Sequence, residues 1–164
     1  IEAEHYSKVV NKGKIRWKII PDIGRTGAGI APFPVTATAV QPEKDSPHTE
    51  YNFYSYGSGD LKVSAYFSPT LNFHNEEKGL QYAISIDDEE PQIITVNTYT
   101  NENVWEKWTA ANINIKKSAH HLLKPGKHVL KYWMVQPGLV LQKIVIDLGG
   151  EKPSYLGPPE TIKK

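Results

Sequence analysis

The chain lacks cysteine, long hydrophobic runs and any large excess of charge. Without thiols it cannot form disulfides, zinc–thiolate sites or a cysteine nucleophile. No apolar run approaches the roughly 20 residues that a membrane-spanning helix needs. The net charge is +1, from 19 basic and 18 acidic residues. The composition therefore gives no reason to expect a nucleic-acid or membrane partner.

The length of 164 residues, with 39% hydrophobic residues, fits a single globular domain with its own core. We expect residues 1–150 to form this domain. Residues 151–164 are proline-rich and have no core-forming periodicity, so we expect them to form an extended tail. Because the chain starts at Ile1 without a signal peptide, we expect an excised domain or a processed product.

Period-two alternation dominates the middle of the chain. Within Leu61–Phe67 the odd positions are apolar, which is typical of a half-buried strand. Tyr82–Ile86 repeats the pattern, and Asp87–Gln92 then provides an acidic, proline-containing turn. The spacing of such runs predicts an all-β fold, an antiparallel β-sandwich of jelly-roll type. A helix is plausible only around Asn101 to Lys107.

Motifs for catalysis are weak. The acidic cluster Asp87–Glu90 lies in a predicted turn, where such residues are usually solvated. The glycine-rich segment Gly24–Gly29 is flanked by prolines and shows neither the strand nor the helix that a dinucleotide site needs. It is better explained as a loop with unusual backbone angles. The sequence contains no Gly-x-Ser-x-Gly elbow and no Walker-type phosphate loop. We therefore expect no catalysis from this chain alone.

Several longer motifs resemble one family, the C-terminal domain of glycoside hydrolase family 115, the xylan α-1,2-glucuronidases. They are Ile1–Ser7, Trp17–Pro34, Ser68–Phe73, Ser85–Asp88, Trp105–Trp108, Asn112–Ile115 and Lys152–Pro159. The resemblance implies a non-catalytic β-sandwich attached to a catalytic domain that lies upstream. It also implies a secreted or periplasmic parent α-glucuronidase.

Calcium-bearing carbohydrate-binding modules show a further resemblance, since they begin with Glu-x-Glu and close with a strand ending in Asp. It implies that Glu2, Glu4 and Asp147 hold a structural calcium ion, with a carbonyl of the Gly24–Gly29 loop as an additional ligand. The alternative is that Glu2 and Glu4 are surface charges on an edge strand.

Sugar binding requires exposed aromatic rings. Trp105 and Trp108, with Tyr99 nearby, are the best candidates, although a packed structural role is an open alternative. Trp17 and Trp133 lie in strand-like runs and are expected in the core.

Two other groups of side chains are weaker candidates. The tyrosines Tyr51, Tyr54 and Tyr56 form a second candidate surface, or simply cover one face of a sheet. His120 and His121 would face opposite ways on a strand, which argues against a shared metal.

Two functions follow from these expectations. One is a carbohydrate-binding-like accessory domain that recognises xylan or glucuronoxylan oligosaccharides. The other is a structural scaffold that packs on the catalytic domain or builds a homo-oligomer without binding sugar. A proline-rich tail favours the scaffold, because a pre-extended segment binds readily along a neighbouring surface.

Overall fold

The computed structural model describes residues 1–97, 102–152 and 154–161, which form two five-stranded antiparallel sheets. The first sheet contains, in spatial order, β1 (Lys8–Val10), β4 (His48–Ser55), β9 (Gly126–Met134), β6 (Leu80–Ile86) and β7 (Gln92–Asn97). The second contains β2 (Arg16–Ile20), β3 (Gly29–Phe33), β10 (Leu141–Asp147), β5 (Gly59–Phe67) and β8 (Asn114–Leu122). The predicted all-β sandwich is confirmed.

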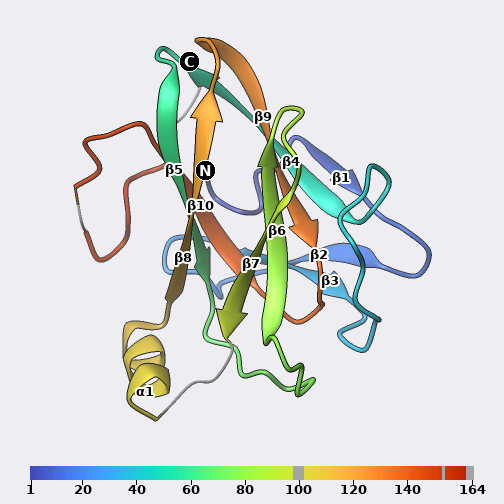
Figure 1. The fold of residues 1–164 in the computed structure, drawn as a ribbon. Helices are drawn as coiled ribbons and strands as arrows, with labels where there is room; N and C mark the ends of the chain where they lie inside the picture. The colour runs from blue at the N-terminus through green and yellow to red at the C-terminus, as the bar shows by residue number, and fades with distance from the viewer. Residues whose placement is uncertain (98–101, 153, 162–164) are drawn as a thin grey trace.

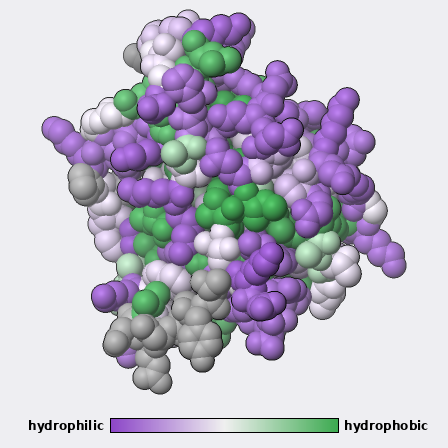
Figure 2. Space-filling model, viewed as in Figure 1, coloured by the Kyte–Doolittle hydropathy of each residue, from purple (hydrophilic) through white to green (hydrophobic). Residues whose placement is uncertain are grey.

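The chain passes repeatedly from one sheet to the other, and one helix, α1 (Glu102–Ala111), joins β7 to β8. Figure 1 shows α1 at the lower end of the sandwich and the β4–β5 and β8–β9 turns at the upper end. The two ends are therefore built from different connections. Figure 2 shows the same face as mostly hydrophilic, with hydrophobic surface gathered near its middle, over β6 and β7.

The core lies between the inward faces of the two sheets. On β5 the odd residues from Leu61 to Phe67 are all buried, as the alternation predicts. Aromatic rings fill the centre, where Tyr82 lies 4.8 Å from Phe67 and 5.6 Å from Tyr132 between ring centroids. Trp17 lies 5.5 Å from Tyr132, which confirms its expected core position.

The second half of the outward face of β5 is also buried, although Lys62 on the same face is exposed, which differs from the half-buried strand that the pattern predicts. Ser64 and Tyr66 are both almost inaccessible to solvent. Tyr66 packs with Ile113 and Val145 in a small second cluster, and Gly157 of the C-terminal tail approaches its ring closely enough that a Cβ would lie 3.4 Å from its hydroxyl. The difference arises because the tail covers this part of the sheet.

The helix forms where the sequence suggests one but extends further, to Ala111. It ends at Asn112, whose φ of 50° is left-handed, a conformation that asparagine tolerates better than most residues. The Ile113 N–H then donates to the Trp108 carbonyl oxygen at 3.0 Å. This hydrogen bond closes the end of the helix where the chain turns toward β8.

The acidic turn between β6 and β7 is bonded to neighbouring strands rather than simply solvated. The carboxylate of Asp87 accepts from the Val129 N–H at 2.9 Å and lies 2.7 Å from His128 Nδ1. Glu89 lies 2.7 Å from His120 Nδ1 on β8, in the opposite sheet. The turn therefore links the two sheets at this edge, a structural role that the sequence pattern alone does not indicate.

Candidate functional site

The aromatic end of the molecule is defined by Trp105 and Trp108 on α1. Residues three apart lie on the same face of a helix, and both tryptophans are half-buried. Partly exposed indoles can stack on the apolar face of a sugar ring while their remaining surface anchors the helix. Tyr99, the third predicted member of this group, lies outside the described residues.

A lysine from the neighbouring strand covers part of this aromatic surface. The Lys116 Nζ lies 5.4 Å from the centre of the Trp108 ring, within cation–π distance. Burial lowers the pKa of Lys116 below its ordinary value of 10.5, because removing water disfavours the charged ammonium. The ammonium group of Lys116 therefore lies beside the Trp108 ring and is a potential hydrogen-bond donor there.

The other predicted aromatic residues divide between core and surface. Trp133 is buried, as expected, and its Nε1–H donates to the Ser85 hydroxyl at 3.0 Å. Tyr51 is also buried, with its hydroxyl donating to the Ala3 carbonyl oxygen at 2.8 Å. Tyr54 and Tyr56 are exposed and contact one another edge to face, 4.9 Å apart. The tyrosine series therefore does not form one continuous surface.

Glu2 and Glu4 lie together at the N-terminal edge, where residues 1–3 run alongside β10. Both carboxylates approach Gly27, where an added Cβ would lie 2.5 Å from Glu4 Oε1 and 3.6 Å from Glu2 Oε2. We call this region, Glu2 and Glu4 with the loop 24–29, the carboxylate edge. Glycine is needed at 27 for this close approach and not for the unusual backbone angles that the sequence suggests.

The loop offers hydrogen-bond donors to the two carboxylates. The Thr26 hydroxyl donates to Glu2 at 2.8 Å, and the Ala28 N–H donates to Glu4 Oε1 at 2.8 Å. The resemblance predicts a carbonyl oxygen of this loop as a further calcium ligand, whereas the loop contacts the two carboxylates through a hydroxyl and an N–H. Glu4 Oε2 is buried and makes no hydrogen bond.

Asp147 is not part of the carboxylate edge. The β10 residue opposite Glu2 is Lys143, and Asp147 lies four residues further along the strand, roughly 13 Å away at the rise of an extended chain. Its carboxylate accepts from the Gly149 N–H at 2.8 Å and from the Glu151 N–H at 3.3 Å. The structure therefore does not bring Asp147 together with Glu2 and Glu4.

No metal centre replaces the predicted one elsewhere in residues 1–97, 102–152 and 154–161, where no three His, Asp or Glu side chains converge in a way that could hold an ion. The predicted calcium ion, with Glu2, Glu4 and Asp147 as its ligands, stays a prediction. His120 is buried and His121 is exposed on β8, so the expectation that they face opposite ways is confirmed.

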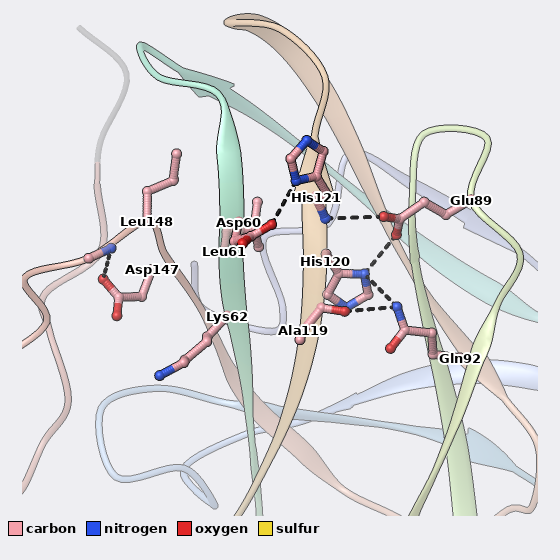
Figure 3. A pocket seen from close by; sticks show the side chains of 11 residues that line it. Asp60, Leu61, Lys62, Glu89, Gln92, Ala119, His120, His121, Asp147 and Leu148 are labelled. Carbon is pink, nitrogen blue, oxygen red and sulfur yellow. Dashed lines mark hydrogen bonds and ion pairs between the residues drawn. The ribbon is translucent and has the colours of Figure 1, made fainter.

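An open hollow of about 660 Å³ lies at the upper end of the sandwich, and sequence reasoning missed it. Figure 3 shows its wall of polar side chains, with His121 against Asp60 and His120 against Glu89. The Asp147 carboxylate points back to its own chain on the far side. Since these groups come from four separate strands and turns, no local sequence signal could have assembled them.

The C-terminal tail packs against the sandwich. We call residues 151–152 and 154–161 the strap. Arg25 stacks on Tyr155 of the strap, with its guanidinium carbon 4.0 Å from the ring centre, and donates to the Tyr155 carbonyl oxygen. The strap therefore lies against its own domain, and the boundary after residue 150 stays a prediction. In the described part of the chain, no helix is long and apolar enough to cross a membrane.

The two packed antiparallel sheets form a β-sandwich, a fold that solved carbohydrate-binding modules share. A family 35 carbohydrate-binding module from Clostridium thermocellum is similar in structure, with a TM-score of 0.55 and 12% identity over 89% of this chain and 96% of that one. A module from Cellvibrio mixtus lichenase 5A, solved in complex with cellotriose, has a TM-score of 0.55 and 13% identity over 92% of this chain and 96% of that one. At this identity the likeness shows the fold alone.

The chain belongs to the glycosyl hydrolase family 115 C-terminal domain, whose profile matches residues 1–160. The family GH115 4-O-methyl-α-glucuronidase BtGH115A, with specificity for decorated arabinogalactans, is similar in structure, with a TM-score of 0.65 and 15% identity. The match covers 88% of this chain and 18% of that one, so the chain spans under a fifth of the relative's length. No curated protein sequence matches the chain. The resemblance to this family is thereby confirmed.

Proposed function

We propose that this domain binds carbohydrate for a parent xylan α-glucuronidase, with Trp105 and Trp108 as the stacking surface. The observation that carries the proposal is the pairing of two half-buried indoles on one face of α1. A fully structural pair would be expected to lie in the core, as Trp17 and Trp133 do. Lys116, beside Trp108, adds a donor for sugar hydroxyls.

The parent enzyme, its substrate and its location belong to the same proposal. We infer a secreted or periplasmic glycoside hydrolase whose catalytic domain is the immediate partner of this one. Xylan or glucuronoxylan oligosaccharides are the ligands to try first, and decorated arabinogalactans are the natural comparison, since BtGH115A is specific for them.

The test is isothermal titration of the chain with glucuronoxylan oligosaccharides, with tryptophan fluorescence recorded in parallel. Trp105→Ala and Trp108→Ala should each weaken saturable binding by about 1–2 kcal/mol, roughly tenfold in Kd. Tyr56→Ala is the control, because it removes an exposed aromatic ring from the other end of the sandwich. Binding that survives both tryptophan variants would refute the proposed site.

A scaffolding function is the second candidate, and one observation favours it. Four large apolar side chains at the upper end are exposed, Tyr54 by 57%, Tyr56 by 92%, Leu123 by 90% and Leu148 by 42%. Tyr54 and Tyr56 contact one another, and Leu148 lies 3.5 Å from where a Cβ on Gly57 would be. Clustered exposed apolar groups favour protein contacts. Absence of sugar binding, together with loss of catalytic-domain association in Tyr56→Ala, would establish this alternative.

A further inference from the structure

The carboxylate edge contains a buried cation that belongs to the chain itself. Lys143, on β10, has a side chain only 4% exposed, and its Nζ lies 3.1 Å from Glu2 Oε1. Glu2 is 12% exposed, so both charges are largely removed from water. A buried lysine is costly unless its charge and its hydrogen bonds are satisfied.

The ammonium of Lys143 has a partner for each of its three hydrogens. Besides Glu2, it donates to the carbonyl oxygens of Leu156 at 3.2 Å and Pro158 at 3.4 Å. A lysine has three donors, so this environment saturates them. Two of the three acceptors belong to the strap, which the same ammonium therefore joins to the N-terminal edge.

A local irregularity of β10 brings Lys143 to this position. The pairing of β10 with β5 shifts between Leu141 and Lys143, which is the mark of a β-bulge. Leu141 and Ile144 are both completely buried, and the shift allows Lys143 to lie on the opposite, outward face beneath the strap. Regular alternation from Leu141 would place residue 143 on the core face, so the bulge is what puts this cation on the outward face, beneath the strap.

The residues at this edge do not fit the predicted calcium site. The third carboxylate is absent, because Asp147 caps its own chain. The loop turns the Ala28 N–H toward Glu4, and an N–H cannot act as a calcium ligand, which must be an oxygen. The positive charge next to Glu2 is already provided by Lys143.

We propose that Lys143 takes the place of a metal ion at the carboxylate edge, neutralising Glu2 and fastening the strap, so that the fold needs no divalent cation. Glu4 retains one unpaired buried oxygen and is stabilised through the Ala28 N–H. This inference does not depend on sugar binding, and it assigns to this domain a stability independent of calcium.

The first arm of the test uses the unaltered chain. Its melting temperature should be the same in excess EDTA and in millimolar calcium, and the purified protein should contain no stoichiometric metal. A melting temperature that falls in EDTA and returns with calcium would overturn the proposal. This arm remains decisive if the variants below fail to fold.

The second arm removes the ammonium. Lys143→Met should lower the melting temperature by on the order of 10 °C, because it leaves Glu2 buried without its counter-charge. Lys8→Met is the matched control, since Lys8 pairs with Glu50 at 3.0 Å but has a side chain 61% exposed. The control should lose about 2 °C or less. Equal losses in the two variants would contradict a special role for Lys143.

The third arm measures how firmly the strap is attached to the sandwich. Limited proteolysis should trim residues 151–161 several-fold faster in Lys143→Met than in the unaltered chain or in Lys8→Met. The double variant Glu2→Gln with Lys143→Met should lose less stability than the sum of its single variants. Unchanged trimming, or strict additivity, would show that Lys143 does not fasten the strap to Glu2.

Discussion

The carboxylate edge and the aromatic end differ in how completely their side chains are paired or buried within the chain. At the edge, Lys143 has three acceptors for three hydrogens and almost no contact with solvent. At the aromatic end, Trp105 and Trp108 remain half-exposed on a surface helix. Charged groups at the edge are therefore paired within the fold, whereas the two indoles leave part of their surface exposed to solvent.

Arg25 connects the two regions. Its Nε donates to the Ala111 carbonyl oxygen at 3.0 Å, at the C-terminal end of α1, and its Nη2 donates to the same oxygen. Its ring contact and its Nη1 hydrogen bond reach Tyr155 of the strap. A cation near a helix C-terminus also interacts favourably with the helix dipole.

Removing Arg25 should have the largest effect on both regions. We expect Arg25→Met to destabilise the domain by about 2–4 kcal/mol, because it removes several charge-assisted hydrogen bonds and leaves carbonyl groups unpaired. Chemical denaturation measures the loss, and titration with oligosaccharide shows whether the position of α1 also changes. Arg16→Met is the control, since Arg16 is exposed and donates only to the nearby carbonyls of Gly13 and Ile15. Equal losses would show that the link is unimportant.

Acid should weaken the edge and spare the aromatic end. Although burial raises the pKa of Glu160, the Glu2 N–H and His5 donate to its carboxylate and hold that pKa below its ordinary value of 4.5. A carboxyl group with a lowered folded pKa contributes stability above its unfolded pKa and loses it as pH falls through the folded pKa.

The melting temperatures of the unaltered chain and of Glu160→Gln should therefore differ by about 2 °C near neutral pH. They should converge as the pH falls from the ordinary value of 4.5 through the lowered pKa of Glu160. Glu77→Gln, at an exposed glutamate between β5 and β6, should match the unaltered chain throughout. A difference between the chain and Glu160→Gln that persists in acid would mean that Glu160 acts by packing rather than by charge.

The smallest change sharpens the comparison at the aromatic end. Lys116→Met removes the cation above Trp108 and should cost about 0.5–1 kcal/mol of stability at most, the size of a cation–π contact near a surface. Tryptophan emission should shift while the melting temperature stays nearly constant. Lys117→Met, on the exposed face of the same strand, is the control. A loss of several kcal/mol would place Lys116 among the structural cations.

Local patterns predict much of the fold, because they report which side of a strand is apolar. The alternation in Leu61–Phe67 correctly identifies the core face of β5. It does not reveal that Ser64 and Tyr66 are also buried, because the covering strap lies about 90 residues away in the sequence. Burial by a distant segment leaves no periodic signal.

The candidate site shows the same limit. The tryptophan pair is visible in the sequence because its two members are neighbours on one helix. The partner of Glu2 is not, since the register that places Lys143 opposite Glu2, next to the bulge, arises from long-range pairing. Asp147 is predicted as the partner of Glu2 because it ends the last strand, whereas the residue opposite Glu2 in the structure is Lys143, four positions earlier.

The contact between the two ends of the described chain has a consequence for engineering. The Glu2 N–H donates to Glu160 Oε1 at 3.0 Å across 158 positions of sequence. The first and last described segments of the chain therefore lie next to each other. A short peptide joining the ends would reduce the entropy of the unfolded chain without straining the folded one. New ends could then be opened at an exposed turn such as that at Tyr56. The domain is thus suited to circular permutation and to insertion, as a unit, into a surface loop of another protein.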